Sequence, residues 1–306
     1  MSNILVIGGS GFMGSHTADM LSEDGHVVSI LDRVSSSWLR DDQRMIVGNL
    51  MDPDILELAM QDIDCVYYFA GIADIAEAKS DPYNTIEINI MGLTKALEAS
   101  VKHNIKKFVY ASTMYVYSSH GSFYRASKQA AEIIIEAYHE KYGIDFVFLR
   151  YGSLYGPRSQ DWNGIKGFVR QIVETGALEY SGNGSEVREY IHVLDAAKLS
   201  VKALSKEYRN RAITITGQQS LKVSDMLSMI FEIEGKKVNI SFLDTQESSS
   251  HYGNTPYRYT PKTSMKIIPT EFVDFGQGLL EVIEEIHTPY RYTPKISMKN
   301  NTNRIC

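Results

Sequence analysis

Cysteine is scarce in this sequence, because only Cys65 and Cys306 occur among its 306 residues. Two thiols cannot build the disulfide framework of a small secreted domain, and they cannot supply the cysteine clusters that hold zinc or iron–sulfur groups. We therefore predict no metal site. With no secretory signal at its start, the chain is also predicted to work in the reducing cytoplasm.

Positive charge and long apolar runs are lacking as well. The chain has 31 Lys and Arg residues against 37 Asp and Glu residues, which gives a formal net charge of −6. Without an overall basic field we expect no nucleic-acid partner, and without a long apolar span we expect no membrane segment. An anionic ligand must then be held by a few arginines or by helix N-termini.

Short apolar runs rich in Val, Ile, Phe and Tyr are abundant in the first half of the chain, and helical segments separate them. Such runs are typical of parallel strands that are covered by helices on both faces. The pattern predicts an α/β fold with a Rossmann-type, doubly wound parallel sheet. The six predicted strands lie within residues 3–9, 26–32, 44–48, 64–70, 106–112 and 145–151.

The pattern changes after residue 156, where the strand and helix signals become shorter. We predict a dinucleotide-binding domain at 1–156, a smaller, partly interleaved α/β substrate lobe at 157–287, and a tail at 288–306. An internal repeat connects the last two parts, because TPYRYTPKTSMK at 255–266 recurs as TPYRYTPKISMK at 288–299. We expect the first copy to lie at the edge of the substrate lobe and the second to be a dispensable tail.

A glycine-rich turn joins the first predicted strand to the first helix, with Gly8, Gly11 and Gly14 at three-residue spacing. Glycines let the backbone approach a pyrophosphate, whose charge is then stabilised by free amides and the helix dipole. A tight strand–helix turn without a ligand would need the same residues. Asp32, at the end of the second strand, favours the dinucleotide interpretation, since a carboxylate there can accept hydrogen bonds from the adenosine ribose.

The same carboxylate predicts which dinucleotide is bound. Asp32 would repel a 2′-phosphate on the ribose, so NAD is favoured over NADP. Arg33 beside it reduces that preference.

A Tyr-x-x-x-Lys motif, Tyr124 and Lys128, opens the helix that follows the fifth predicted strand, and Ser112 and Thr113 end that strand. Tyrosine and lysine at this spacing lie one turn apart on one helix face. Taken alone, the pair could be two ordinary residues of a surface helix. Its position behind the Ser-Thr pair favours a proton-transfer site instead.

The order of these motifs resembles the extended short-chain dehydrogenases/reductases, the NAD-dependent epimerase/dehydratase family, whose members act mostly on nucleotide sugars. The resemblance covers residues 1 to 286 approximately. Besides the glycine turn and the Tyr/Lys pair, it includes NLMD (49–52), FAG (69–71), INIMGLTKALEA (88–99), RYGSLYGP (150–157) and GNGSEVREYIHVLDAA (182–197).

The resemblance implies a role for each matching residue. Thr113, Tyr124 and Lys128 would be catalytic, while Ser153 and Arg188, together with Thr113, would contact the substrate, Arg188 through its diphosphate. NAD would be the cofactor. The residues expected to bind it are Gly8, Gly11, Phe12, Met13, Gly14, Asp32, Arg33, Asn49, Leu50, Ala70, Gly71, Asn89, Tyr124 and Lys128.

These residues can carry out oxidation of an alcohol. A phenol has an ordinary pKa of about 10, but the Lys128 ammonium and a positively charged nicotinamide favour the ionised phenol, so that Tyr124 can act as a base. Tyr124 would remove the proton of a sugar hydroxyl while the carbinol hydride leaves for the nicotinamide. Thr113 would hydrogen-bond to the same oxygen.

Two departures from the resembled family narrow the reaction. Met114 and Tyr115 follow Thr113 where sugar dehydratases carry Asp-Glu, which argues against elimination of water. The segment 114–123 is short, and we expect an open site that can accept a hexose or a heptose. What remains is oxidoreduction at carbon 4 of a nucleoside-diphosphate sugar, by a 4-epimerase or by a 4-dehydrogenase or 4-ketoreductase, as in polysaccharide biosynthesis.

Three further expectations stay open at this point. A dinucleotide-binding sensor without catalytic activity would keep the glycine turn, and a reductase of a non-sugar carbonyl would keep the Tyr/Lys pair. The helices expected at 82–103 and 121–141 are predicted to pair across a two-fold axis and form a homodimer.

Overall fold

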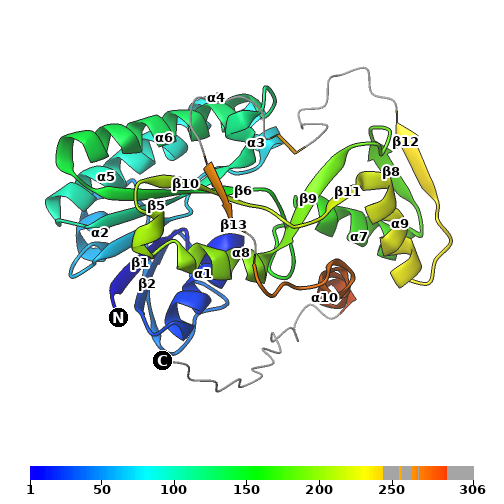
Figure 1. Ribbon diagram of the computed structural model, residues 1–306, viewed down its shortest axis with the longest axis horizontal. Helices are drawn as coiled ribbons and strands as arrows, with labels where there is room; N and C mark the ends of the chain where they lie inside the picture. The colour runs from blue at the N-terminus through cyan, green and yellow to red at the C-terminus, as the bar shows by residue number, and fades with distance from the viewer. Residues whose placement is uncertain (244–254, 257–263, 268, 288–306) are drawn as a thin grey trace.

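The computed structural model describes residues 1–243, 255–256, 264–267 and 269–287. A large sheet with helices on both faces forms one end of the molecule, and a smaller lobe forms the other end (Figure 1). The large sheet has eight strands in the order β13-β10-β6-β5-β4-β1-β2-β3. Every neighbouring pair in it is parallel, so the predicted Rossmann-type doubly wound sheet is confirmed.

All six predicted strands are present in this sheet. Most apolar residues of these runs are buried, as expected for strands with helices above and below them, and the exposed exceptions are Val27 at the start of β2 and Val47 at the end of the edge strand β3. Their bounds are β1 Asn3–Ile7, β2 Val27–Asp32, β3 Gln43–Val47, β4 Cys65–Tyr68, β5 Lys107–Thr113 and β6 Asp145–Tyr151.

Alternate residues of each strand serve two separate cores. Leu5 and Ile7 pack under one layer of helices, whereas Ile4 and Val6 pack under the other. The first layer contains α2 Pro53–Ala59, α5 Leu93–Lys102 and α6 Ser122–Tyr142, and the second contains α1 Phe12–Glu23 and α8 Val193–Lys202. Three short helical segments precede α5, namely α3 Ile75–Ser80, α4 Pro82–Ile86 and the π-helix η1 Glu87–Gly92.

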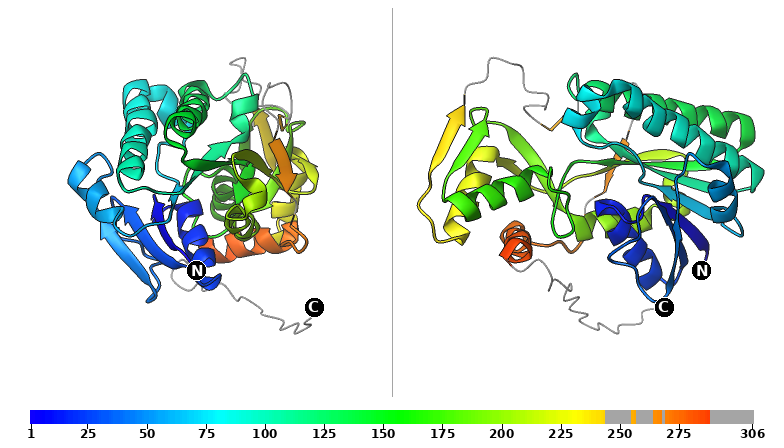
Figure 2. Two further views of the ribbon diagram at one scale, coloured as in Figure 1. Left: turned by 60° about the vertical axis from the view of Figure 1, so that its left-hand side comes forward. Right: turned by 180° about the vertical axis from the view of Figure 1, so that it is seen from behind.

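The smaller lobe has a core of its own, and both views in Figure 2 show it beside one end of the large sheet. Two small sheets belong to this part, in the orders β11-β9-β7 and β12-β8. The strands are β7 Ser153–Tyr155, β8 Leu178–Ser181, β9 Val187–His192, β11 Ser220–Lys222 and β12 Ile240–Leu243. The helices are α7 Gly164–Thr175, α9 Val223–Ile233 and α10 Phe275–His287.

The chain returns to the large sheet after entering the lobe. β10 Arg211–Ile215 pairs with β6, and β13 Ser264–Ile267 pairs with β10. The segment 157–287 thus supplies two strands and α8 to the first part of the molecule. Two short 3-10 turns, η2 Met114–Tyr117 and η3 Lys206–Tyr208, complete the described elements.

The first copy of the repeat lies partly where we expected it. Thr255 at its start contacts β9 of the lobe, because its amide donates to the Val187 carbonyl at 3.2 Å and its Oγ1 accepts from the Glu189 amide at 3.1 Å. Residues 264–266 at its end and the following Ile267 form β13 at the edge of the large sheet. β13 pairs with the backbone groups at the otherwise open edge of β10, which explains why this part of the repeat joins the large sheet. The second copy and the predicted tail at 288–306 lie outside the described residues.

Candidate active site

A cleft of about 1090 Å³ opens outside the carboxyl ends of the central strands and extends toward the smaller lobe. This is where doubly wound sheets bind ligands. Residues from both parts of the molecule line it, including the glycine turn, the end of β5, the start of α6 and residues of β8 and β9.

The glycine turn is closely packed at this end of the sheet. Gly8 has a φ of +82°, and a Cβ built on it would lie 2.6 Å from the Ala70 amide nitrogen. A Cβ on Gly14 would lie 2.2 Å from the Gly8 carbonyl oxygen. Gly11 is the N-cap of α1 and has no side chain to occupy the free amides, so the turn leaves a helix N-terminus open toward the cleft.

Asp32 ends β2 beside this turn. Its Oδ2 accepts a hydrogen bond from the Ser10 amide at 3.0 Å, and its Oδ1 accepts one from the Val34 amide at 3.3 Å. A carboxylate has about four acceptor sites, so two remain for a ribose. Arg33 also lines the cleft at this position.

The predicted adenine and phosphate neighbours lie together on the cleft wall, but Asn89 lies behind it. The lining includes Asn49, Leu50, Ala70 and Gly71. Asn89 is buried in η1, where it accepts from the Ile72 amide at 2.7 Å and donates to the Ile72 carbonyl at 3.0 Å. Asn89 is therefore not among the lining residues, and it supports the loop that carries Gly71.

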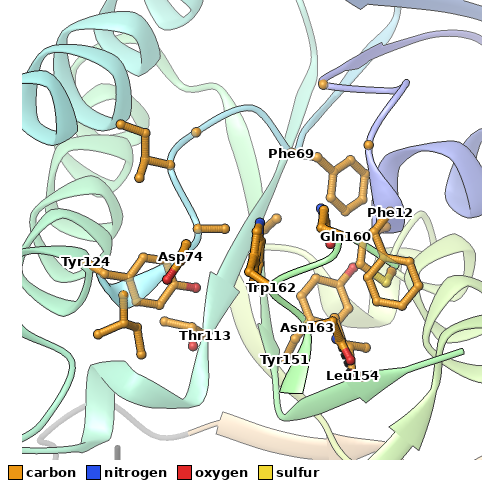
Figure 3. A pocket seen from close by; sticks show the side chains of 18 of the residues that line it. Phe12, Phe69, Asp74, Thr113, Tyr124, Tyr151, Leu154, Gln160, Trp162 and Asn163 are labelled. Carbon is orange, nitrogen blue, oxygen red and sulfur yellow. Dashed lines mark hydrogen bonds between the residues drawn. The ribbon is translucent and has the colours of Figure 1, made fainter. Parts of the chain in front are cut away.

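The predicted catalytic residues meet at the same cleft. Thr113 ends β5 and Tyr124 lies in the first turn of α6, and Figure 3 shows both side chains on one side of the pocket. The Lys128 Nζ donates to the Ala111 carbonyl at 2.8 Å and lies 5.9 Å from the centre of the Tyr124 ring. Thr113 Oγ1 accepts from the Tyr115 amide at 3.2 Å.

Lys128 is buried, and burial disfavours its charged form. Its pKa falls to about 8 because of desolvation, which the nearby Glu132 carboxylate opposes. Lys128 thus remains protonated at neutral pH while its charge is little screened by solvent. An ammonium in that position favours the ionised form of a neighbouring phenol.

A buried ion pair behind the catalytic residues was not predicted from the sequence. Arg150 of β6 donates to Glu132 of α6 through Nε at 2.9 Å and through Nη2 at 2.6 Å. Ser112 Oγ donates to the same carboxylate at 2.6 Å, and Arg150 also bonds the Tyr117 hydroxyl. Two features of the sequence could have revealed this pair, namely an arginine inside an apolar strand and a glutamate one helical turn after Lys128.

The lobe side of the cleft contains the predicted substrate residues Ser153 and Arg188. It also contains residues that sequence reasoning missed, since they come from loops. Trp162, 49% exposed, stands in Figure 3 between the Tyr124 side of the pocket and the side that carries Phe12. Aromatic rings cluster at the lobe end, where Phe168 and Tyr180 have ring centres 5.7 Å apart.

Two further features, a metal-binding cluster and a membrane-spanning helix, are absent from the described part of the chain. No group of three or more His, Cys, Asp or Glu side chains there could hold a metal ion. No helix within it is both long and apolar enough to cross a membrane.

Comparison with known proteins decides the family. Residues 4–215 match the model of the NAD dependent epimerase/dehydratase family. The chain belongs to this family. The resemblance seen in the motifs, the prediction of an enzyme and the prediction of NAD as its cofactor are thereby confirmed.

Individual relatives agree with this membership. A Bacillus subtilis protein named as an uncharacterized UDP-glucose epimerase, YtcB, is 27% identical over 86% of this chain and 94% of its own. The structure of a UDP-glucuronic acid 4-epimerase from Bacillus cereus with UDP-glucuronic acid and NAD has a TM-score of 0.80 at 26% identity, over 94% of this chain and all of the other. A UDP-glucose 4-epimerase from Thermotoga maritima shares the fold, with a TM-score of 0.82 at 24% identity and 94% and 100% coverage.

The residues at the cleft fit NAD. The glycine turn is a backbone cradle that added Cβ atoms would fill, and Asp32 keeps acceptor capacity beside it. Both features suit a pyrophosphate and an adenosine ribose.

Proposed function

We propose that this protein carries out oxidoreduction at carbon 4 of a nucleoside-diphosphate hexose or heptose. The first of two candidate reactions is 4-epimerisation through a 4-keto sugar. The observation that carries this proposal is the convergence of Thr113, Tyr124 and Lys128 on the cleft that the glycine turn opens. Solved relatives named 4-epimerases support it, one of them bound to a UDP-sugar and NAD.

The chain's own residues account for the proton movement. Tyr124 accepts the proton of the carbon-4 hydroxyl and returns it when the ketone is reduced. Thr113 donates a hydrogen bond to the same oxygen through Oγ1. The buried Lys128 ammonium favours the ionised phenol before the proton arrives.

The cofactor is held by the residues of the first part of the molecule. The glycine turn would hold the pyrophosphate, Asp32 would accept from the adenosine ribose, and Lys128, which also lines the cleft, would contact the nicotinamide ribose. When bound, NAD supplies a hydride acceptor for carbon 4.

Arg188 and the aromatic cluster support a nucleoside diphosphate as the rest of the substrate. A guanidinium can clamp two phosphate oxygens through paired donors. Arg188 lines the cleft from β9, and Tyr180 from β8 offers a ring near it. Neighbouring aromatic rings can stack on a base.

A 4-dehydrogenase or 4-ketoreductase is the second form of this chemistry. Only Ser118 to Gly121 separate η2 from α6, so little chain covers the pocket beside Tyr124. A site with a short cover could release the 4-keto sugar before hydride returns to its other face. A product with an unchanged ring and a new ketone would then leave the enzyme.

The test is to incubate the protein with UDP-, GDP- and dTDP-hexoses while reduced nicotinamide and product stereochemistry are followed. A new carbon-4 stereoisomer without lasting reduction of the cofactor supports the epimerase. Stoichiometric reduced cofactor with a 4-keto product supports the dehydrogenase. Bound NAD without turnover of any sugar would leave the sensor as the correct account.

A homodimer is the expected assembly. Several large apolar side chains are exposed on α4, η1 and α6, including Tyr83 at 79%, Met91 at 50% and Ile133 at 60%. These helices lie along one side of the molecule in Figure 1. A second copy across a two-fold axis would cover the same surface on both chains.

A further inference from the structure

Acidic residues outnumber basic residues along the cleft. Among the lining residues that the structure describes, three are basic, namely Arg33, Lys128 and Arg188. Five are acidic, namely Asp32, Asp74, Glu87, Glu179 and Glu186. A substrate that carries negative charge can pair it with one of these three cations or with free backbone amides such as those at the start of α1.

The three cations come from different parts of the chain. Arg33 follows Asp32 at the adenosine end of the cleft, and Arg188 belongs to β9 of the lobe. Lys128 lies beside Tyr124, but it is buried and its Nζ donates to the Ala111 carbonyl at 2.8 Å. A substrate diphosphate would occupy Arg188, so a second anionic group on the sugar would depend on the buried Lys128 or on neutral donors.

A carboxylate also lines the part of the cleft that holds Tyr124. Asp74, from the loop after β4, lines the cleft, and Figure 3 shows it on the same side of the pocket as Tyr124. Its Oδ1 accepts from the Ala76 amide at 2.8 Å and so caps α3. This bond occupies one of its two carboxylate oxygens, which leaves Oδ2 available to a ligand.

The chemistry of the sugar brings its substituents close to Asp74. Tyr124 acts on the hydroxyl of carbon 4, and carbon 5 is bonded directly to that carbon. A uronate carries its carboxylate on carbon 5, within a few bonds of the reacting oxygen. A hydroxymethyl group at the same place can donate a hydrogen bond to Asp74, whereas a carboxylate can only repel it.

We propose that the site selects a sugar without a carboxylate and that Asp74 is the residue that rejects uronates. This inference rests on the proposed function and names the substrate class of the same site. Rejection by a charge that faces the wrong substrate is a common source of specificity. Asp74 would in addition orient a neutral sugar by accepting from one of its hydroxyls.

The test compares UDP-glucose with UDP-glucuronate on the full chain loaded with NAD, together with Asp74→Asn. Asparagine keeps one oxygen to cap α3, removes the charge and places an amide NH2 donor where the second carboxylate oxygen was. We expect the wild type to favour UDP-glucose by at least about tenfold in kcat/KM, and Asp74→Asn to reduce this ratio about tenfold by raising the value for the uronate. Asp52→Asn is the matched control, because Asp52 caps α2 in the same way and does not line the cleft.

Each outcome has a separate meaning. Equal or better turnover of UDP-glucuronate by the wild type would overturn the selectivity while the proposed function stands. If the wild type prefers UDP-glucose and Asp74→Asn leaves the ratio of the two kcat/KM values unchanged, Asp74 is not the residue that rejects uronates. If UDP-sugars are not turned over, the same comparison is made with GDP-mannose and GDP-mannuronate. Absence of turnover with both pairs would contradict the proposed function itself, and with it this inference.

Discussion

At the scale of single residues, the cleft combines side chains from regular elements with side chains from loops. Thr113, Tyr124 and Lys128 follow one another along the chain at fixed spacing, so a sequence pattern can reveal them. Asp74 and Trp162 reach the same cleft from loops. The path of a loop depends on tertiary contacts that leave no local periodicity.

Tyr124→Phe tests the proton transfer. The variant loses only the hydroxyl, so kcat should fall by about two to four orders of magnitude while NAD affinity changes little. Turnover by stopped assays and NAD binding by calorimetry measure the two effects. A variant that kept more than about a hundredth of the rate would show that another group moves the proton.

His16 gives a prediction for stability against pH. It is buried, and desolvation together with the Arg158 charge lowers its pKa from 6.5 to about 3. Between these values the unfolded chain binds more protons than the folded chain, so stability is full above pH 6.5 and falls toward pH 3 by up to about 1.4 kcal/mol per unit. His16→Gln should make thermal unfolding less sensitive to pH between 7 and 5. If the variant's thermal unfolding depended on pH as strongly as that of the wild type, the loss of stability in acid would come from other groups.

At the scale of elements, apolar runs predicted the strands of the first half, and non-local pairing produced the rest. The buried run of β6 was recognised, but its neighbour β10 is five residues long and comes 60 positions later. The place of β10 in the sheet is decided by its pairing with β6. In this pairing Ile213 of β10 lies opposite Leu149 of β6.

The ion pair between α6 and β6 should matter more for stability than exposed pairs do. Glu132→Gln would leave the Arg150 guanidinium buried without its partner, at a cost of about 3–5 kcal/mol. Arg170→Gln breaks a pair with Asp161 that is mostly exposed, and should cost less than about 1 kcal/mol. Thermal unfolding of both variants measures the difference. Equal midpoints would contradict a structural role for the buried pair.

At the scale of the whole molecule, the cleft exists because two parts of the chain meet. The large sheet presents the glycine turn and Tyr124, and the lobe presents Arg188. β10 and β13 return from the lobe to the sheet, so the two parts are connected by several crossings of the chain. The pattern change after residue 156 predicted a second, partly interleaved part of the chain, but it did not identify which strands return, because strand order in a sheet is not encoded locally.

The dimer is tested by placing a charge on the exposed helical surface. Ile133→Glu should give a monomer in light scattering, since a carboxylate on an apolar two-fold interface is repeated on the partner and must be desolvated. Val34→Glu is the control, because Val34 is equally exposed, at 61% against 60% for Ile133, and lies near the glycine turn. A monomeric wild type would show that the apolar surface has another role.

The central claim is that carbon 4 of the sugar is oxidised in this cleft, and a deuterium label at that carbon tests it most directly. With UDP-[4-²H]glucose and the NAD-loaded protein, we predict a primary isotope effect on turnover, with the label retained at carbon 4 of an epimerised product or found in the reduced cofactor. Deuterium released into water would contradict the claim, because the C–H bond at carbon 4 would then break as an acid and not as a hydride donor.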